Sequence, residues 1–429
     1  MNDGYFFEYM KSLLGDRYGA FIDAYTTKPR HKALRVNTRK ITVERFRELF
    51  GGELTLNPLC ANSFYCDVKP SLDPLYHAGL YYMQEPSASG AVSAFAPFIG
   101  ERVLDLCAAP GGKSTQAAEY MHGGVLFCND SEYKRTKALS ENIERLGISN
   151  AVVTCGTAGD YVAAGFAEYF DTLIVDAPCS GGGMMRYESV PYSENIVKGC
   201  ADRQREILAD GVKLLCGGGY MLYSTCTFAK EENEDNIEFL RSLGMETVDI
   251  PLKEGEERGI DIPNARRVYP MNFDGEGHFY CVLKKITGDV SERDPLRKKR
   301  SSVKFGGLKR DVAEIIGKRI ILDVAGTPFP DLSGLNVIVA GTPVYDDGAP
   351  SHALTHALGQ ESVRLFGTVE LGELARNYIA GEQIDLSAPQ GNLIATVNGH
   401  ALGLARAAAG GDGHRVLKNK YPKQLRIRN

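Results

Sequence analysis

The chain has 429 residues, of which 43% are hydrophobic and 24% charged. This composition is ordinary for a globular protein, and the length suffices for two to four domains with their own cores. No apolar stretch approaches the roughly 18 residues that a membrane-spanning helix needs, and the amino terminus lacks the pattern of a signal peptide, so we expect a cytoplasmic protein that contacts no membrane. The formal net charge of −5 argues against a protein that coats nucleic acid over its whole surface.

The ten cysteines are scattered, with no Cys-x-x-Cys pair and no Cys/His cluster at zinc spacing. His352 and His356 stand four residues apart, but no third ligand is near them in the sequence. We therefore expect no metal site and no disulfide framework.

The first part of the chain predicts a small α+β unit. Residues 9–24 are helix-like, residues 33–37 are strand-like, and residues 42–50 form a second helical pattern. We assign residues 1–75 to an N-terminal, RNA-binding-like domain.

Residues 76–288 alternate between apolar strands and amphipathic helices, which is typical of a parallel sheet covered on both faces. A strand over 79–86 and a helix from Ser87 lead into this region. The predicted strands are 102–107, 124–129, 151–155, 171–176 and 219–225, with helices at 112–121, 132–146, 200–216 and 231–243 and a late strand at 278–283. The fold class is α/β, with a Rossmann-like core.

Two further segments follow. Residues 289–350 predict a basic linker and a small connecting domain, and residues 351–429 predict a small β-rich domain with glycine turns. The runs 297–310 and 415–428 are rich in Lys and Arg and contain no acid. They are either solvated linker and tail or patches that contact phosphates, and Tyr421 is either a stacking platform or a buried plug.

A glycine turn lies between the first strand of the alternating region and its helix. Residues 109–114 resemble a phosphate-binding loop, but the first glycine of Gly-x4-Gly-Lys-Ser would stand at position 107, which is cysteine. A nucleoside triphosphatase is therefore a rival interpretation. Asp130 ends the second strand, where an acid commonly binds ribose hydroxyls, and this favours an adenosyl ligand.

Cys179 and Cys226 each follow an apolar strand, and both are candidate nucleophiles. A thiolate that adds to C6 of a pyrimidine makes C5 electron-rich, so that C5 attacks an activated methyl group. The ring must be polarised at N3, for which Asp176 is the candidate acid, and we expect burial to raise its pKa.

Six segments resemble the Sun/Fmu family of RNA cytosine-C5 methyltransferases, which use S-adenosylmethionine. They are LRVN at 34–37, YMQEP at 82–86, DLCAAPGGK at 105–113, DAPCSG at 176–181, STCT at 224–227 and RVYP at 267–270. The segment from Gly403 to Arg426 looks like the PUA-like tail of the RsmF-type branch, which methylates 16S, the small-subunit ribosomal RNA. The resemblance implies a methyltransferase domain at 76–288 and a PUA-like RNA-binding domain at 351–429.

The same resemblance assigns roles to residues. It implies that Cys226 forms the covalent bond to C6 and that Cys179 helps to release the product, with Asp176 as the third catalytic residue. The implied cofactor contacts are Cys107, Ala108, Ala109, Pro110, Gly111, Gly112, Lys113, Asp130, Arg135 and Asp176. Family members commonly carry an acid near the adenine, where this chain has Thr157 or, in a shifted turn, Asp160.

The expected partner is ribosomal RNA or the small ribosomal subunit, and we expect a monomer that requires no metal. A second rival is a non-catalytic RNA-binding scaffold that has kept a methyltransferase fold. The presence of both thiols, the acid and the glycine turn argues against it.

Overall fold

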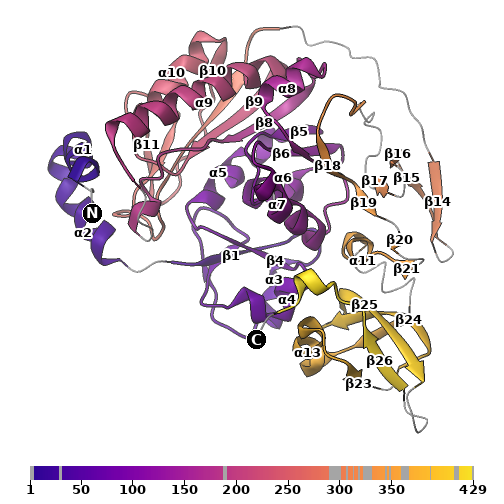
Figure 1. The fold of residues 1–429 in the computed structure, drawn as a ribbon. Coiled ribbons are helices and arrows are strands. Elements are labelled where there is room, and N and C mark those ends of the chain that lie inside the picture. Colours follow the sequence, from indigo (N-terminus) through magenta and orange to yellow (C-terminus); the bar gives the residue numbers. More distant parts are fainter. Residues whose placement is uncertain are drawn as a thin grey trace.

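The computed structural model describes residues 4–28, 31–186, 191–288, 301–305, 308–312, 314–316, 319–321, 331–343, 345–346, 349–358, 367–386, 388–409 and 415–427. Within these residues the chain forms a central sheet with helices on both faces, a smaller sheet from residues 33–84 and another from residues 367–419 (Figure 1). This confirms the predicted α/β class. No helix in the described part of the chain is long and apolar enough to cross a membrane.

The central sheet holds ten strands among the described residues, in the order β11-β12-β13-β9-β8-β5-β6-β7-β18, with β10 beside β13. Strands β5 to β9 run parallel, and β13 is antiparallel to β9. The bounds are β5 (Arg102–Asp105), β6 (Val125–Asp130), β7 (Ala151–Cys155), β8 (Phe170–Asp176), β9 (Leu215–Thr225), β10 (Met245–Thr247), β11 (Glu256–Arg258), β12 (Arg266–Val268), β13 (His278–Lys285) and β18 (Val337–Ala340).

Helices cover both faces of this sheet because its strands are apolar on both sides. On one face lie α5 (Ala88–Phe95), α6 (Gly112–Tyr120) and α7 (Tyr133–Leu146), and on the other α8 (Ala158–Ala163), α9 (Glu194–Leu214) and α10 (Glu234–Ser242). The sequence analysis did not predict α8, whose six residues are too few for a helical period to stand out.

The edge strand β18 corrects the predicted division of the chain. Residues 337–340 fall in the connecting unit assigned to 289–350, but they pair antiparallel with β7 and extend the central sheet. Cys155 N–H donates to the Asn336 carbonyl at 2.9 Å, and Gly341 N–H donates to the Ala151 carbonyl at 2.9 Å. The open edge of β7 is a long-range partner that local patterning does not show.

The side chains of the whole basic run at 297–310, and of the residues that follow it up to 330, lie outside the described part of the chain. Backbone is described for the hairpin β14 (Ser301–Phe305) with β15 (Leu308–Val312) and for the three strands β16 (Glu314–Ile316), β17 (Arg319–Ile321) and β19 (Thr342–Pro343). A short pair joins β20 (Tyr345–Asp346) to β21 (Ala349–Pro350).

The N-terminal sheet has the order β2-β3-β1-β4, with β2 (Thr55–Leu56), β3 (Ser63–Tyr65), β1 (Ala33–Val36) and β4 (Tyr81–Gln84). Its helices are α3 (Val43–Leu49), which Thr42 caps, and α4 (Pro74–His77), which Asp73 caps. Because β4 pairs with β1, the N-terminal unit continues past the predicted boundary at residue 75.

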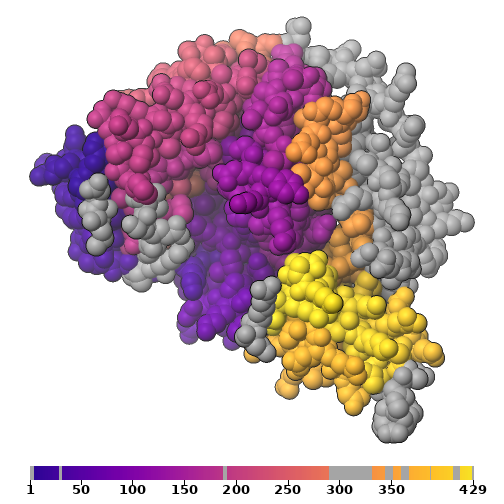
Figure 2. Space-filling model, in the orientation of Figure 1, coloured from indigo at the N-terminus to yellow at the C-terminus, as the bar shows by residue number. Residues whose placement is uncertain are grey.

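The helix predicted at 9–24 is wrong in its continuity. The chain forms α1 (Gly4–Leu14) and α2 (Tyr18–Thr27), separated at Gly15, whose positive φ of 55° interrupts the helix. Both helices pack against Val197, Phe228 and Tyr269, which belong to the unit of the central sheet, and not against the N-terminal sheet. In Figure 2 the dark blue N-terminal residues abut the pink surface of that unit.

The C-terminal unit is a five-stranded sheet, β22-β24-β25-β26-β23, beside α11 (His352–Leu358) and α13 (Ala375–Ala380). Its strands are β22 (Gly367–Glu370), β23 (Ile384–Asp385), β24 (Gly391–Val397), β25 (His400–Ala409) and β26 (Arg415–Asn419). It shares one apolar cluster with the N-terminal sheet.

Tyr421 lies in that shared cluster, and the stacking role proposed for it is wrong. Its ring is 3% exposed, and its hydroxyl lies 2.9 Å from Nδ1 of His77. His352 and Tyr378 pack against the same ring. Tyr421 is therefore a buried plug between the two units and is not open to a nucleobase.

Candidate functional site

The predicted site residues meet at one edge of the central sheet. Strands β5, β6, β8 and β9 are parallel, so their carboxyl ends share an edge. Asp130 ends β6, Asp176 ends β8, and Cys226 directly follows β9. In open α/β sheets, ligands bind outside this edge.

The glycine turn connects β5 to α6. Gly111 has φ of +112°, in a region that side chains disfavour, and α6 begins at the next residue. The free amides at the start of α6 point to the same edge, as they do in anion and nucleotide sites.

A buried arginine fixes this helix to the N-terminal sheet. Arg35 of β1 donates from Nε to Glu119 at 2.8 Å and from its guanidinium to the Gly112 carbonyl at 2.9 Å. It also donates to Oγ1 of Thr115 at 2.8 Å. A buried guanidinium with several hydrogen bonds orients its partners strongly, so the N-terminal sheet positions the glycine turn.

Asp130 is almost fully buried beside that turn. Its carboxylate accepts hydrogen bonds from Ala109 N–H at 3.3 Å and from Glu132 N–H at 3.0 Å. Arg135 lies 3.0 Å from the same carboxylate and also donates to the Ala109 carbonyl at 2.7 Å. These contacts fix the turn against the end of β6.

Lys113 and Asp176 form an ion pair of 2.8 Å at the centre of the edge, and Ser224 Oγ donates to the same carboxylate at 2.8 Å. The expectation of a raised pKa for Asp176 is wrong. Burial alone would raise it, but the charge of Lys113 and the hydrogen bonds from Lys113 and Ser224 together lower the pKa of Asp176. The carboxyl group of Asp176 is therefore ionised at neutral pH.

The two candidate nucleophiles are adjacent. The sulfur atoms of Cys179 and Cys226 lie 3.1 Å apart, and both thiols are free. The hydrogen bond between the thiols, together with burial, raises the pKa of Cys179 well above its ordinary value. Cys179 is therefore a protonated thiol at neutral pH, a form that can donate a proton.

A buried polar network fixes the loop that carries Cys179. Glu232 accepts from Ser180 N–H at 3.0 Å and from the Ser180 hydroxyl, and Gln204 donates to it at 2.8 Å. Gln204 also donates to the Pro178 carbonyl at 2.9 Å. The sequence analysis missed Glu232 and Gln204, because neither belongs to the segments that carry the motif resemblance.

The N-terminal helices cover the same loop from outside. The Tyr25 hydroxyl donates to the Gly182 carbonyl at 2.8 Å, and Phe6 packs beside Gly182. Arg186 donates to the Ala24 carbonyl at 3.2 Å. The first two helices and the thiol-bearing loop, which are far apart in the sequence, are thus joined in the fold.

His278, the first residue of β13, is a further residue that was not predicted from the sequence. Phe279 of β13 pairs with Thr225, the last residue of β9. His278 directly precedes Phe279 and Cys226 directly follows Thr225, so both lie next to this last pair. The ring is 4% exposed, and its Nε2 has no hydrogen-bond partner among the described residues. The signal that could have identified His278 is its position as the first residue of β13. This strand runs antiparallel to β9, which the predicted nucleophile follows.

The edge fits an adenosyl cofactor. Asp130 stands where an acid binds ribose hydroxyls, and the glycine turn leaves backbone amides open at the start of α6. One carboxylate oxygen of Asp105, Oδ1, is buried and has no hydrogen-bond partner among the described residues. The other oxygen, Oδ2, accepts a hydrogen bond from the Ser114 hydroxyl at 2.6 Å. Burial raises the pKa of Asp105 to about 7. Polar groups left unmet in a buried site are what an incoming ligand satisfies.

Thr157 and Asp160, the two residues considered for the place of the family's acid, bond to each other. Thr157 caps α8, and Asp160 accepts hydrogen bonds from the Thr157 N–H at 2.7 Å and from its hydroxyl at 2.9 Å. These hydrogen bonds form a capping box, so the Asp160 carboxylate already has hydrogen-bond donors within its own turn. In the residues that the structure describes, no cluster of three His, Cys, Asp or Glu side chains could hold a metal ion.

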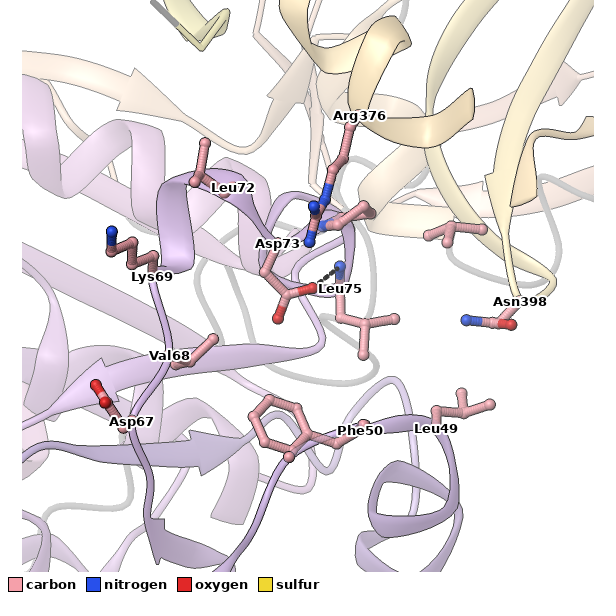
Figure 3. A pocket seen from close by; sticks show the side chains of 14 residues that line it. Leu49, Phe50, Asp67, Val68, Lys69, Leu72, Asp73, Leu75, Arg376 and Asn398 are labelled. Carbon is pink, nitrogen blue, oxygen red and sulfur yellow. Dashed lines mark hydrogen bonds between the residues drawn. The ribbon is translucent and has the colours of Figure 1, made fainter. Parts of the chain in front are cut away.

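A pocket of about 480 Å³ lies elsewhere, between the N-terminal sheet and the C-terminal unit. Figure 3 shows Phe50, Lys69 and Asp73 from the first unit and Arg376 and Asn398 from the second around it. None of the predicted site residues lines this pocket.

Three family models match the chain. One described as 16S rRNA methyltransferase RsmB/F matches residues 92–284, one described as the N-terminal domain of 16S rRNA methyltransferase RsmF matches 4–86, and one described as the methyltransferase RsmF PUA domain matches 369–427.

Curated relatives carry the name ribosomal RNA small subunit methyltransferase F. The protein of Vibrio campbellii is 33% identical over 313 residues, which cover 68% of this chain and 64% of that protein. The match thus spans slightly less than two thirds of that relative. The protein of Psychromonas ingrahamii is 28% identical over 94% of this chain and 92% of its own length.

Solved structures share the fold. A methyltransferase homolog protein from Pyrococcus horikoshii superposes with a TM-score of 0.58 at 29% identity, covering 65% of this chain and 93% of its own. NSun6 from the same organism, solved with SFG, has a TM-score of 0.58 at 22% identity and covers 66% of this chain and 97% of its own.

Proposed function

The chain belongs to the 16S rRNA methyltransferase RsmB/F family, and from this premise we propose that it transfers a methyl group from S-adenosylmethionine to C5 of a cytosine in small-subunit ribosomal RNA. The observation that carries the proposal is the pair of thiols 3.1 Å apart, at a sheet edge that also holds the glycine turn. A phosphate-transferring enzyme has no use for two such thiols.

In the proposed reaction Cys226 is the nucleophile. Its thiol loses a proton to solvent, the sulfur bonds to C6, and the electron pair of the C5–C6 double bond moves to C5. S-adenosylmethionine supplies the methyl group that C5 receives. Transfer of the C5 proton to a water molecule restores the double bond, and the electron pair of the S–C6 bond returns to Cys226.

Cys179 and Asp176 assist at separate points. The protonated Cys179 thiol lies against the Cys226 sulfur, where it stabilises a thiolate by hydrogen bonding both before attack and at release. Asp176, held by Lys113 and Ser224, is placed to bind the polar edge of the pyrimidine. N3 of cytosine carries no proton and Asp176 is ionised, so the proton that the two share must be taken up from solvent when the base binds; once shared, it increases the electrophilic character of C6.

The cofactor contacts remain those assigned from the sequence. We propose that residues 107–113 surround the methionine end of the cofactor, that Asp130 binds the ribose, and that Asp176 also contributes. Arg135 pairs with Asp130 in the free protein, so it must share that carboxylate with the ribose.

The target base must be unpaired or extruded from its helix before it reaches a thiol at the end of a strand, at a cost of about a few kcal/mol. The N-terminal and C-terminal units would bind the flanking RNA through phosphates and shape. Lys69 and Arg376, one from each unit, face the pocket between these units and are the candidate phosphate contacts (Figure 3).

Replacing Lys69 and Arg376 together with alanine should weaken RNA binding and reduce the slope of log K against log salt by about 2, because each phosphate that is no longer neutralised lowers the slope by about 1. Filter binding across a salt series measures this. Replacing Lys198 and Lys213 of α9, both exposed, is the matched control. An unchanged slope in the pocket variant would exclude this pocket from the RNA interface.

The direct test of the function is methyl transfer. Purified protein with tritiated S-adenosylmethionine and small-subunit RNA, either naked or in subunits from a strain lacking the protein, should label the RNA, and bisulfite sequencing should locate a 5-methylcytosine. Calorimetry should show binding of S-adenosylhomocysteine and not of ATP with magnesium. Binding of ATP alone would instead support the triphosphatase interpretation.

A further inference from the structure

His278 is a buried polar residue for which the fold has no evident use. Its ring is 4% exposed, and its Nε2 has no hydrogen-bond partner among the described residues. Leaving a buried polar group unpaired destabilises the folded protein. A phenylalanine of similar shape has no polar atom to leave unpaired. The imidazole of His278 therefore makes the protein less stable when no ligand is bound.

The surroundings of His278 are those of the reaction centre. Its strand neighbour Phe279 pairs with Thr225, the residue before Cys226. Lys113 and Asp176 are close enough to act on its charge. His278 therefore lies beside the nucleophile and the ion pair, at the same edge of the sheet.

The imidazole is neutral in this position. Burial and, to a smaller extent, the Lys113 cation lower the pKa of His278 to about 3, although the charge of Asp176 opposes the change. A group with so low a pKa is a poor proton acceptor at neutral pH, which argues against a role as general base. A neutral imidazole instead offers one hydrogen-bond donor and one acceptor.

We propose that His278 is a substrate-binding residue, whose unpartnered nitrogen hydrogen-bonds the polar edge of the target pyrimidine when the base enters the site. This inference rests on the proposed function and deepens it. It accounts for the missing partner, because the incoming base supplies it, and for the place of the residue beside Cys226 and Asp176. The hydrogen bond fixes the orientation of C6 toward the sulfur.

The test compares two substitutions. His278→Phe keeps the ring shape and removes both nitrogens, and it should lower kcat/KM for RNA by about 10- to 100-fold. His278→Gln, whose amide reaches the position of Nε2, should remain within about fivefold of the unchanged protein. His122→Gln is the matched control, since His122 is exposed in the α6–β6 connection at the opposite edge of the sheet.

Two further measurements separate a substrate contact from other roles. The melting temperature of His278→Phe should be equal to or above that of the unchanged protein, because an unmet buried nitrogen is removed. Its affinity for S-adenosylhomocysteine should be unchanged. A lower melting temperature would indicate a structural role, and a loss of cofactor affinity would place the nitrogen against the cofactor; either result overturns the proposal.

Equal kcat/KM for His278→Phe and the unchanged protein would also overturn it while leaving the proposed function standing. If the unchanged protein labels no RNA, the proposed function fails, and this inference fails with it.

Discussion

Replacing Cys226 with alanine is expected to abolish methyl transfer, by about 10³-fold or more, because the reaction loses its covalent step. Affinity for S-adenosylhomocysteine should be unchanged, since the glycine turn and Asp130 lie on other strands of the sheet. Labelling with tritiated cofactor and calorimetry measure the two quantities on the same preparation.

Cys216→Ala is the matched control for this experiment. Cys216 stands at the start of β9, the strand that Cys226 follows, and so at the opposite edge of the sheet. We expect its removal to leave transfer intact. Activity in Cys226→Ala equal to that of Cys216→Ala would show that the nucleophile has been misassigned.

Replacing Cys179 with alanine is expected to stop the reaction at a later point. The sulfur of Cys226 loses a hydrogen-bond partner 3.1 Å away, and the departing thiolate loses the protonated group that stabilises it. A covalent complex between protein and RNA should therefore accumulate during turnover and appear as a slowly migrating band on a denaturing gel.

The double variant Cys179→Ala, Cys226→Ala gives the control for that band. It should form no adduct, because the atom that bonds to the base is absent. A band that persists in the double variant would mean that another residue bonds the RNA. Normal turnover with no band in the single variant would remove Cys179 from product release.

Much of this site could be predicted because it lies at strand ends. A buried parallel strand contains a continuous apolar run, and the return of polar residues marks its end, as at Asn129 and Asp130 in β6 and at Asp176 in β8. The carboxyl ends of neighbouring parallel strands meet in space, so residues far apart in sequence could be predicted to lie together. The roles of Cys179 and Cys226 came from the family resemblance and not from this pattern.

The features that could not be predicted depend on interactions between distant segments. The pKa of Asp176 is decided by Lys113 and Ser224, from other elements, and burial alone points in the wrong direction. Tyr421 is buried because His77, far away in sequence, lies opposite its hydroxyl. The significance of His278 depends on its neighbour in the adjacent strand, which the sequence does not show.

The return of the chain to β7 has a practical consequence for dissecting this protein. Strand β18 covers a row of backbone amides and carbonyls on β7 that would otherwise be open. A protein cut after residue 288 would keep every residue proposed for the chemistry and yet expose this row, and such a row readily pairs with another chain. Aggregation of the isolated core would then result from the loss of the edge strand β18 and not from a failure to fold.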